Sequence, residues 1–227
     1  MALDVLYVDN HLLVVAKPAG VPVVPDDSRD VSLLESAKAW IAREYDKPGR
    51  VFLGVVHRLD RPVSGVVCFA RTSKAASRLT DAFRTRAVEK SYWGVSATAP
   101  REDGGRLVQW LVKDRERNRV RAVEARTAER LGAKQAVTTW SVAGRDAAHV
   151  LLALEPETGR SHQLRVAAAS LGAPLLGDLK YGAARPLPDK SVALHAHRLV
   201  VPHPTRREPL TFEAPAPGLA VWDLARR

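Results

Sequence analysis

Residues 51–70 read VFLGVVHRLDRPVSGVVCFA. Two apolar segments, Val51–Val56 and Val66–Ala70, enclose a segment that carries charge, proline and glycine. Short apolar runs rich in β-branched residues are typical of buried strands. Pro62 and Gly65 interrupt the apolar pattern. The sequence therefore predicts two core strands joined by a loop that runs from His57 to Gly65.

Elements on both sides of this segment indicate the fold class. A capping box at Ser32 and Glu35 predicts a helix that runs to about Tyr45, and a second helix follows Thr72 or Ser73. Other strands are expected within residues 5–16, at Lys90–Ala97, at Leu107–Val112 after a turn at Gly104-Gly105, and at Ala136–Val142, His149–Leu154, Val192–Val201 and Leu210–Glu213. A third helix is expected from Ser161 through Leu171, and a short one at the C-terminus. Several connections are too short for a crossover helix, so we expect an α+β fold with a mixed, largely antiparallel sheet flanked by helices.

Composition restricts the class of protein. The chain has 227 residues, a formal net charge of +10 and one cysteine, so a disulfide scaffold is excluded. No apolar run is long enough to cross a bilayer, and the N-terminus does not resemble a signal peptide. We therefore expect a single domain over residues 1–227 in the cytoplasm. Composition leaves the oligomeric state open, and we expect a monomer. The positive charge indicates a polyanionic partner such as nucleic acid, but it fits a composition rich in arginine and alanine equally well.

Several kinds of active site find no support in the sequence. His195 and His197 lie two residues apart in an apolar strand, without the HExxH pattern or cysteine pair of a metal site. Cys68 lies inside an apolar strand, which favours a core residue over a nucleophile. The chain has no GxGxxG motif, Walker loop or Gly-x-Ser-x-Gly motif. We expect neither a bound metal nor a nucleotide cofactor.

Asp60 is the strongest catalytic candidate. It lies between two apolar strands and is flanked by Arg58 and Arg61, which would keep its carboxylate ionised. An ionised aspartate can act as a nucleophile or stabilise positive charge at a sugar C1′. The alternative is an Arg-Asp surface turn, and the tetrad by itself favours that interpretation.

Three further clusters have two interpretations each. In Thr158–Arg165, Gly159 loosens a turn, Arg160 falls at a helix N-terminus that attracts anions, and His162 and Gln163 lie in the first turn. This cluster could equally be an ordinary helix cap. Tyr92, after Lys90 and Ser91, is either a packed strand residue or an aromatic platform for a base. Basic residues at alternate positions from Lys113 to Arg121 would share one strand face, either for phosphates or as a solvated surface.

Taken together and in order, these clusters resemble the RluA-type pseudouridine synthases. The resemblance covers nearly the whole chain and includes Val5–Gly20, His57–Asp60 with Ser64-Gly65, Lys90–Tyr92, Thr158–Arg165, Leu171–Pro174, Gly177-Asp178 with Tyr181-Gly182, and Leu194–Ala196 with His203-Pro204. Pro62, Val63 and Ala167 depart from the usual family residues, and Leu164 is a mild replacement. These departures concern the subgroup and the substrate rather than the reaction.

The resemblance implies the pseudouridine synthase catalytic fold, without the separate N-terminal RNA-binding domain of some members, and an activity. A uridine in rRNA or tRNA would be isomerised to pseudouridine without a cofactor. Asp60 would be the catalytic carboxylate, Arg160 would pair with it, and Tyr92 would stack on the uracil. The base must leave its stack, and Arg58 would fill the space.

RNA contacts are expected from the charged and polar residues of the same clusters. These are His57, Arg58, Arg61, Lys90, His162, Gln163, Arg165, Lys113 and Arg115, and Arg84 and Arg86 could add phosphate contacts. One alternative is a non-catalytic RNA-binding or ribosome-assembly protein on the same fold, which could lose Asp60, Tyr92 or Arg160. A second is a glycosidase, which usually needs a pair of carboxylates, and Asp60 has no partner among the motif residues.

Overall fold

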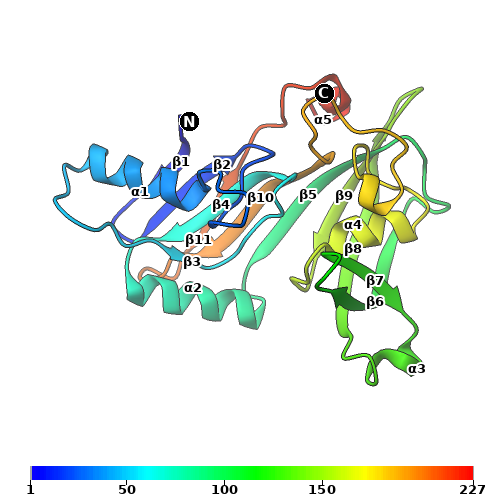
Figure 1. The fold of residues 1–227 in the computed structure, drawn as a ribbon, viewed down its shortest axis with the longest axis horizontal. Helices are drawn as coiled ribbons and strands as arrows, with labels where there is room; N and C mark the ends of the chain where they lie inside the picture. Colours follow the sequence, from blue (N-terminus) through cyan, green and yellow to red (C-terminus); the bar gives the residue numbers. More distant parts are fainter. Residues whose placement is uncertain (1, 227) are drawn as a thin grey trace. The chain divides into compact units, whose positions relative to one another are not determined.

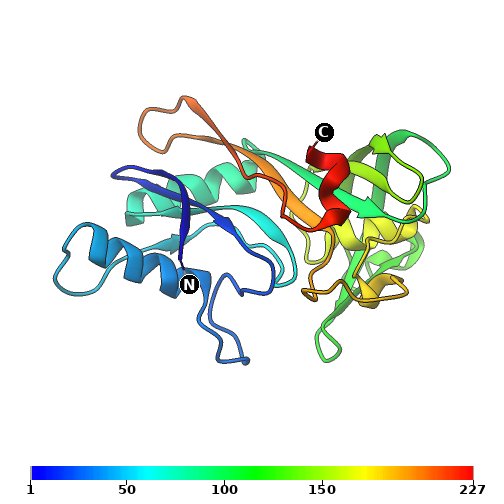
Figure 2. The ribbon, with the colours of Figure 1, turned by 90° about the horizontal axis from the view of Figure 1, so that it is seen from above.

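The computed structural model describes residues 2–226, and Figures 1 and 2 show its ribbon. The chain divides into two compact units, which we describe separately. Unit 1 comprises Met1–Glu89 and Ala196–Pro215, and unit 2 comprises Lys90–His195 and Ala216–Arg227. Within residues 2–226, no helix combines the length and apolar composition required to cross a bilayer.

Unit 1 is a sheet with a helix on each side. Its strands are β1 (Asp4–Val8), β2 (Leu12–Lys17), β4 (Ser64–Ala70) and β10 (Leu194–Pro202), in that order, with β3 (Gly54–Val55) paired to β4 and β11 (Pro209–Glu213) paired to β10. Figure 1 shows α1 (Leu33–Glu44) and α2 (Ser73–Thr85) on opposite sides of these strands. Alternate strand residues such as Val14 and Cys68 pack against Leu79 of α2. The expected capping box of Ser32 and Glu35 is present at the start of α1.

Unit 2 is an antiparallel sheet covered by helix α4, the helix that the sequence predicted from Ser161. Its strands follow the order β5 (Glu89–Ser96), β9 (Val150–Pro156), β8 (Lys134–Arg145), β6 (Gly104–Asp114) and β7 (Arg119–Val123). The short elements are α3 (Ala125–Ala128), η1 (Leu179–Tyr181), η2 (Ala220–Trp222) and α5 (Asp223–Arg226). Val166 of α4 (Gln163–Ser170) packs against Leu111, Ala136 and Tyr181. The strand pairs β5–β9, β9–β8, β8–β6 and β6–β7 are antiparallel, which confirms the α+β class and the largely antiparallel sheet.

The segment with alternating basic residues is a hairpin rather than one strand, so our prediction of a single basic face was wrong. β6 ends at Asp114, and the chain turns before β7 begins at Arg119. Lys113 lies opposite Val120, whereas Arg121 lies opposite Val112. Directly paired residues share a face, so Lys113 and Arg121 point to opposite faces of the sheet.

Three element boundaries also differ from the prediction. Of Val51–Val56, only Gly54 and Val55 form a strand, because pairing with β4 is limited to Ala70 and Phe69. Gly104-Gly105 is not a turn, since both residues lie in β6 opposite Ser141 and Trp140. Helix α4, expected from Ser161, begins at Gln163 because His162 has a φ of +52°, outside the helical region.

Candidate active site

The loop that carries Asp60 is held at both ends within unit 1. His57 Nε2 accepts a hydrogen bond of 2.9 Å from the backbone N–H of Cys68, and the His57 ring stacks on Phe83 at 4.8 Å. The backbone N–H of Val63 donates to the Asp60 carbonyl at 3.0 Å, which closes a turn. Leu59 and Val63 are buried, whereas Asp60 is half-buried. The turn therefore fixes the backbone at Asp60.

Lys17 is a buried cation beneath this loop, and its position was not anticipated from the sequence. Its Nζ donates to three carbonyls, those of Pro18 at 3.0 Å, Val21 at 2.7 Å and Arg61 at 3.1 Å. These bonds join the end of β2 to the residue after Asp60. The only local signal was a lysine directly after an apolar strand and before Pro18.

Arg61 adds a second set of connections to the same loop. Its Nε donates to the Gly20 carbonyl at 2.9 Å, and its guanidinium pairs with Asp30 and, at 3.7 Å, with Asp26. The backbone N–H of Gly20 donates back to the Arg61 carbonyl at 2.8 Å. Arg61 therefore holds residues 20–30 against the loop that carries Asp60.

Burial determines the protonation of Lys17. Removal from water lowers the pKa of Lys17 from 10.5 to about 7; the Asp60 carboxylate opposes this shift and the Arg61 guanidinium adds to it. The ammonium form satisfies all three carbonyls and places a positive charge near Asp60. The structure thus couples the charge of Lys17 to that of the candidate catalytic residue.

We expect Lys17→Met to change how stability depends on pH. Lysine in the unfolded chain titrates near 10.5, whereas Lys17 in the folded chain titrates at about 7. Between these values the unfolded state binds more protons, so the native free energy of unfolding should rise with pH by up to about 1.4 kcal/mol per unit. As pH falls through 7 this contribution is lost. Urea unfolding between about pH 6 and pH 9 should show this slope in the native protein and in Lys38→Met, but not in Lys17→Met. Equal slopes in all three proteins would contradict the assignment.

In unit 2, the strand that carries Tyr92 approaches the loop that carries Arg160. Tyr92 is on β5 opposite Leu154 of β9, and it is half-buried. Lys90, two residues earlier on the same face, approaches the carbonyl of Thr158 with its Nζ at 3.5 Å. The two clusters that the sequence identified separately, Lys90–Tyr92 and Thr158–Arg165, are therefore adjacent in this unit.

Gln163 shapes the Arg160 loop from inside the unit. The buried Gln163 amide donates to the Val137 carbonyl at 2.9 Å, and its Oε1 accepts from the Thr158 hydroxyl at 2.7 Å and from the Arg160 backbone N–H at 3.0 Å. The Arg160 side chain is exposed, and its Nε donates to the Gln135 carbonyl at 3.0 Å. The Nη1 and Nη2 groups of Arg160 take no part in this hydrogen bond.

Tyr181 connects His162, at the end of this loop, to the β6–β7 hairpin. Its hydroxyl accepts a hydrogen bond of 2.8 Å from the Val120 backbone N–H and lies 2.7 Å from His162 Nδ1. Arg165, beneath the same ring, forms a buried two-bond ion pair with Asp178, each bond 2.7 Å long. Since the partner of Arg165 in this ion pair is the buried Asp178, the pair helps to fix the segment that follows Arg160. Gln163 supports the same segment through its bonds to Thr158, Arg160 and Val137.

The predicted site residues thus fall into two groups. His57, Arg58, Asp60 and Arg61 belong to the loop in unit 1. Arg84 and Arg86, on α2 and directly after it, belong to the same unit, and the remaining predicted residues belong to unit 2. Lys113 and Arg115 are exposed at the tip of the β6–β7 hairpin. Among residues 2–226 there is no group of three or more histidine, cysteine, aspartate or glutamate side chains arranged to hold a metal ion. The reactive groups at the predicted catalytic positions are the Asp60 carboxylate, the Tyr92 hydroxyl and the Arg160 guanidinium.

Known proteins with similar sequences are named as RNA pseudouridine synthases. The sequence model of a family described as RNA pseudouridylate synthase matches residues 11–170. Over 220 residues the chain is 37% identical to an uncharacterised RNA pseudouridine synthase of Zymomonas mobilis, covering 96% of this chain and 95% of that protein. It is 36% identical over 228 residues to the ribosomal large subunit pseudouridine synthase D of Xanthomonas campestris, covering 95% of this chain and 66% of that protein.

Two solved structures have a similar fold. The human protein named RNA pseudouridylate synthase domain containing 4 matches with a TM-score of 0.78 at 25% identity, covering 95% of this chain and 89% of that one. The human protein named RNA pseudouridylate synthase domain containing 1 matches with a TM-score of 0.75 at 26% identity, covering 98% and 86% of the two chains.

Proposed function

The chain belongs to the RluA-type family of RNA pseudouridine synthases, and from this premise we propose that Asp60 is the carboxylate that drives the isomerisation. The N1–C1′ bond of a uridine breaks, the uracil turns, and C5 bonds to C1′. The proton lost from C5 balances the proton gained at N1, so reactant and product contain the same atoms. The reaction therefore consumes no cofactor or energy source. The observation that carries this proposal is the turn from Asp60 to Val63, which fixes the Asp60 backbone between the buried residues Leu59 and Val63 and close to the Lys17 ammonium.

The other residues are proposed to bind and orient the target nucleotide. Tyr92 stacks on the uracil and takes part in proton transfer at C5, and Arg160 pairs with Asp60. Flipping the base costs a few kcal/mol, and Arg58, exposed beside Asp60, fills the vacated stack. Since these residues come from both units, we propose that residues 1–227 act as one catalytic domain.

Large-subunit ribosomal RNA is the substrate that we propose. One of the relatives above is named as a ribosomal large subunit pseudouridine synthase, and the net charge of +10 suits an RNA partner. Pseudouridine maps of RNA from cells with and without the gene test the proposal. We expect one or more positions in this ribosomal RNA to lose pseudouridine on deletion. Loss confined to tRNA would overturn the choice of RNA, and no loss anywhere, with no activity of the purified protein on total RNA, would overturn the function.

We expect Tyr92→Phe to lower the single-turnover rate by about 10²-fold or more, because proton transfer by a positioned side chain contributes that much. The ring remains, so RNA binding should change little. Single-turnover pseudouridine formation at saturating RNA measures the effect. Tyr45→Phe, at an exposed tyrosine of unit 1, is the control and should keep the native rate. A native rate in Tyr92→Phe would show that the hydroxyl takes no part in the chemistry.

A further inference from the structure

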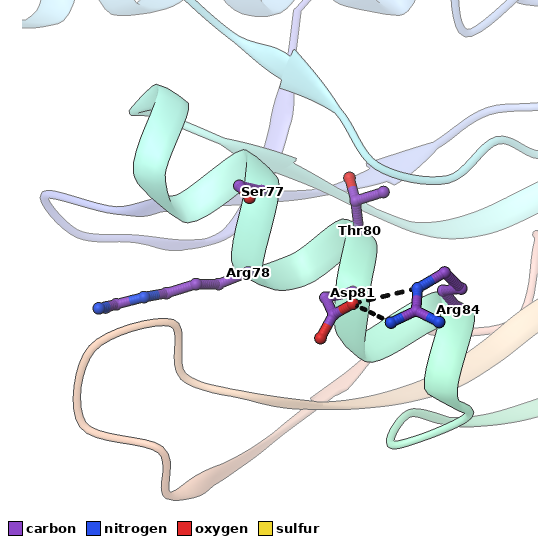
Figure 3. A pocket seen from close by; sticks show the side chains of 5 residues that line it. All are labelled: Ser77, Arg78, Thr80, Asp81 and Arg84. Atoms are coloured by element: carbon purple, nitrogen blue, oxygen red, sulfur yellow. Dashed lines mark hydrogen bonds and ion pairs between the residues drawn. The ribbon is translucent and has the colours of Figure 1, made fainter.

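A shallow hollow of about 440 Å³ lies on the exposed side of α2 (Figure 3). It is lined by Ser77, Arg78, Thr80, Asp81 and Arg84. Two of these side chains are cationic, two are hydroxyls and one is a carboxylate. Among residues 2–226 the hydroxyls of Ser77 and Thr80 have no hydrogen-bond partner, so they remain available to a ligand.

The two guanidinium groups are held in place but not saturated. Arg78 Nη1 donates to the Pro204 carbonyl at 2.6 Å, which leaves its Nε and Nη2 groups available. Arg84 donates from Nε at 3.1 Å and from Nη2 at 2.5 Å to one oxygen of Asp81, as Figure 3 shows, which leaves Nη1. Donors that are already oriented lose less side-chain entropy when they bind an external acceptor.

This side of α2 borders the segment that leads to Asp60. Thr80 lies four residues after Ala76 and three before Phe83, so these three side chains are neighbours on the helix. The Phe83 ring stacks on His57, and a Cβ placed on Gly54 would lie 2.7 Å from Cβ of Ala76. The hollow is therefore next to the segment 54–57, which continues directly into the loop of the proposed catalytic residue.

We infer that the α2 face, formed by Ser77, Arg78, Thr80 and Arg84, binds backbone phosphates of the substrate RNA beside the catalytic loop. The inference rests on the proposed function, because it takes the bound polyanion to be the RNA that is modified. Guanidinium and hydroxyl groups are the donors that position nucleic-acid backbones. A shallow hollow with two guanidinium groups and two hydroxyls in its lining suits an exposed phosphate chain.

Substitutions of Arg84 and of Asp81 should change RNA affinity in opposite directions. Its carboxylate repels a phosphate and also occupies two donors of Arg84. Arg84→Gln should therefore weaken RNA binding about threefold to tenfold at moderate salt and make the slope of log K against log salt shallower by about one. Asp81→Asn should strengthen binding, although it removes an intrahelical ion pair. A role in folding alone would not produce opposite shifts.

The experiment measures filter binding of transcribed large-subunit ribosomal RNA across a range of salt concentrations. The control is the Arg145–Asp103 ion pair of unit 2, with side chains 47% and 78% exposed, against 71% and 61% for Arg84 and Asp81. Arg145→Gln and Asp103→Asn should leave affinity, salt slope and modification rate unchanged.

The binding and modification measurements together separate the α2 phosphate site from the proposed function. A native salt slope in Arg84→Gln, weaker binding by Asp81→Asn, or equal shifts in the control pair would overturn the inference. If the opposite shifts are found but the native protein forms no pseudouridine in RNA, the α2 face binds RNA and the proposed function fails. If pseudouridine forms with no shift in binding, the function holds and the α2 face is not a phosphate site.

Discussion

We expect Asp60→Asn to lower the rate of pseudouridine formation by about 10⁴-fold or more, as removal of a catalytic carboxylate or nucleophile does in other enzymes. Asparagine has nearly the same shape as aspartate but carries no charge, and it can neither attack C1′ nor stabilise positive charge there. The turn that holds this residue uses the Asp60 carbonyl and the Val63 N–H, so the loop should keep its conformation. Single-turnover assays at saturating RNA would measure the loss.

Binding of RNA by Asp60→Asn should remain close to native, because removal of a negative charge does not weaken attraction to phosphates. Asp27→Asn, at an exposed carboxylate of the same unit, is the matched control and should keep the native rate. A near-native rate in Asp60→Asn would show that another group carries the chemistry. Equal losses in both variants would indicate a general effect of charge.

Local signals in the sequence were sufficient for much of the fold. The Ser32–Glu35 capping box predicted the start of α1, and the apolar run Val66–Ala70 predicted a strand that is buried over its full length. Both features depend on residues within one turn of helix or one strand. Such elements are determined by local hydrogen bonds and hydrophobic periodicity, so a single sequence reveals them.

The β6–β7 hairpin could not be predicted in this way. Its turn contains neither glycine nor proline, and the alternation of basic residues continues through it. The turn forms because Asp114 Oδ1 accepts the Arg117 backbone N–H at 3.0 Å and because Asn118 adopts a φ of +43°. Aspartate and asparagine favour such local bonds and left-handed conformations, but they do so in many contexts.

The supporting residues of the site depend on partners that are distant in the sequence. Lys17 binds a carbonyl 44 residues away, and Arg165 pairs with Asp178, 13 residues away. From the sequence, Arg165 could only be interpreted as one more cation for RNA. A buried ion pair becomes evident only when the fold brings the two charges together, which is why the roles of these residues had to come from the structure.

Gly65→Ala should have the largest effect on stability. Gly65 has a φ of +121°, and a Cβ there would lie 2.3 Å from the Ala196 carbonyl oxygen and 2.5 Å from the Ala196 nitrogen, both backbone atoms. Alanine would have to move strand β10 away from β4 or change the backbone conformation of β4. We expect a loss of about 3 kcal/mol or more in the free energy of unfolding, and a fall in Tm of about 6–12 °C.

Gly49→Ala separates the steric clash from backbone strain. Gly49 also has a positive φ, +92°, but nothing lies within 4 Å of its added Cβ. That variant should lose only the strain of an unfavourable conformation, about 1 kcal/mol. Thermal and urea unfolding of both variants would compare the two effects. If they were equally destabilised, contact between β4 and β10 at Gly65 would not be the reason for glycine; a much larger loss in Gly65→Ala would show that the close approach of these strands, five residues after Asp60, requires it.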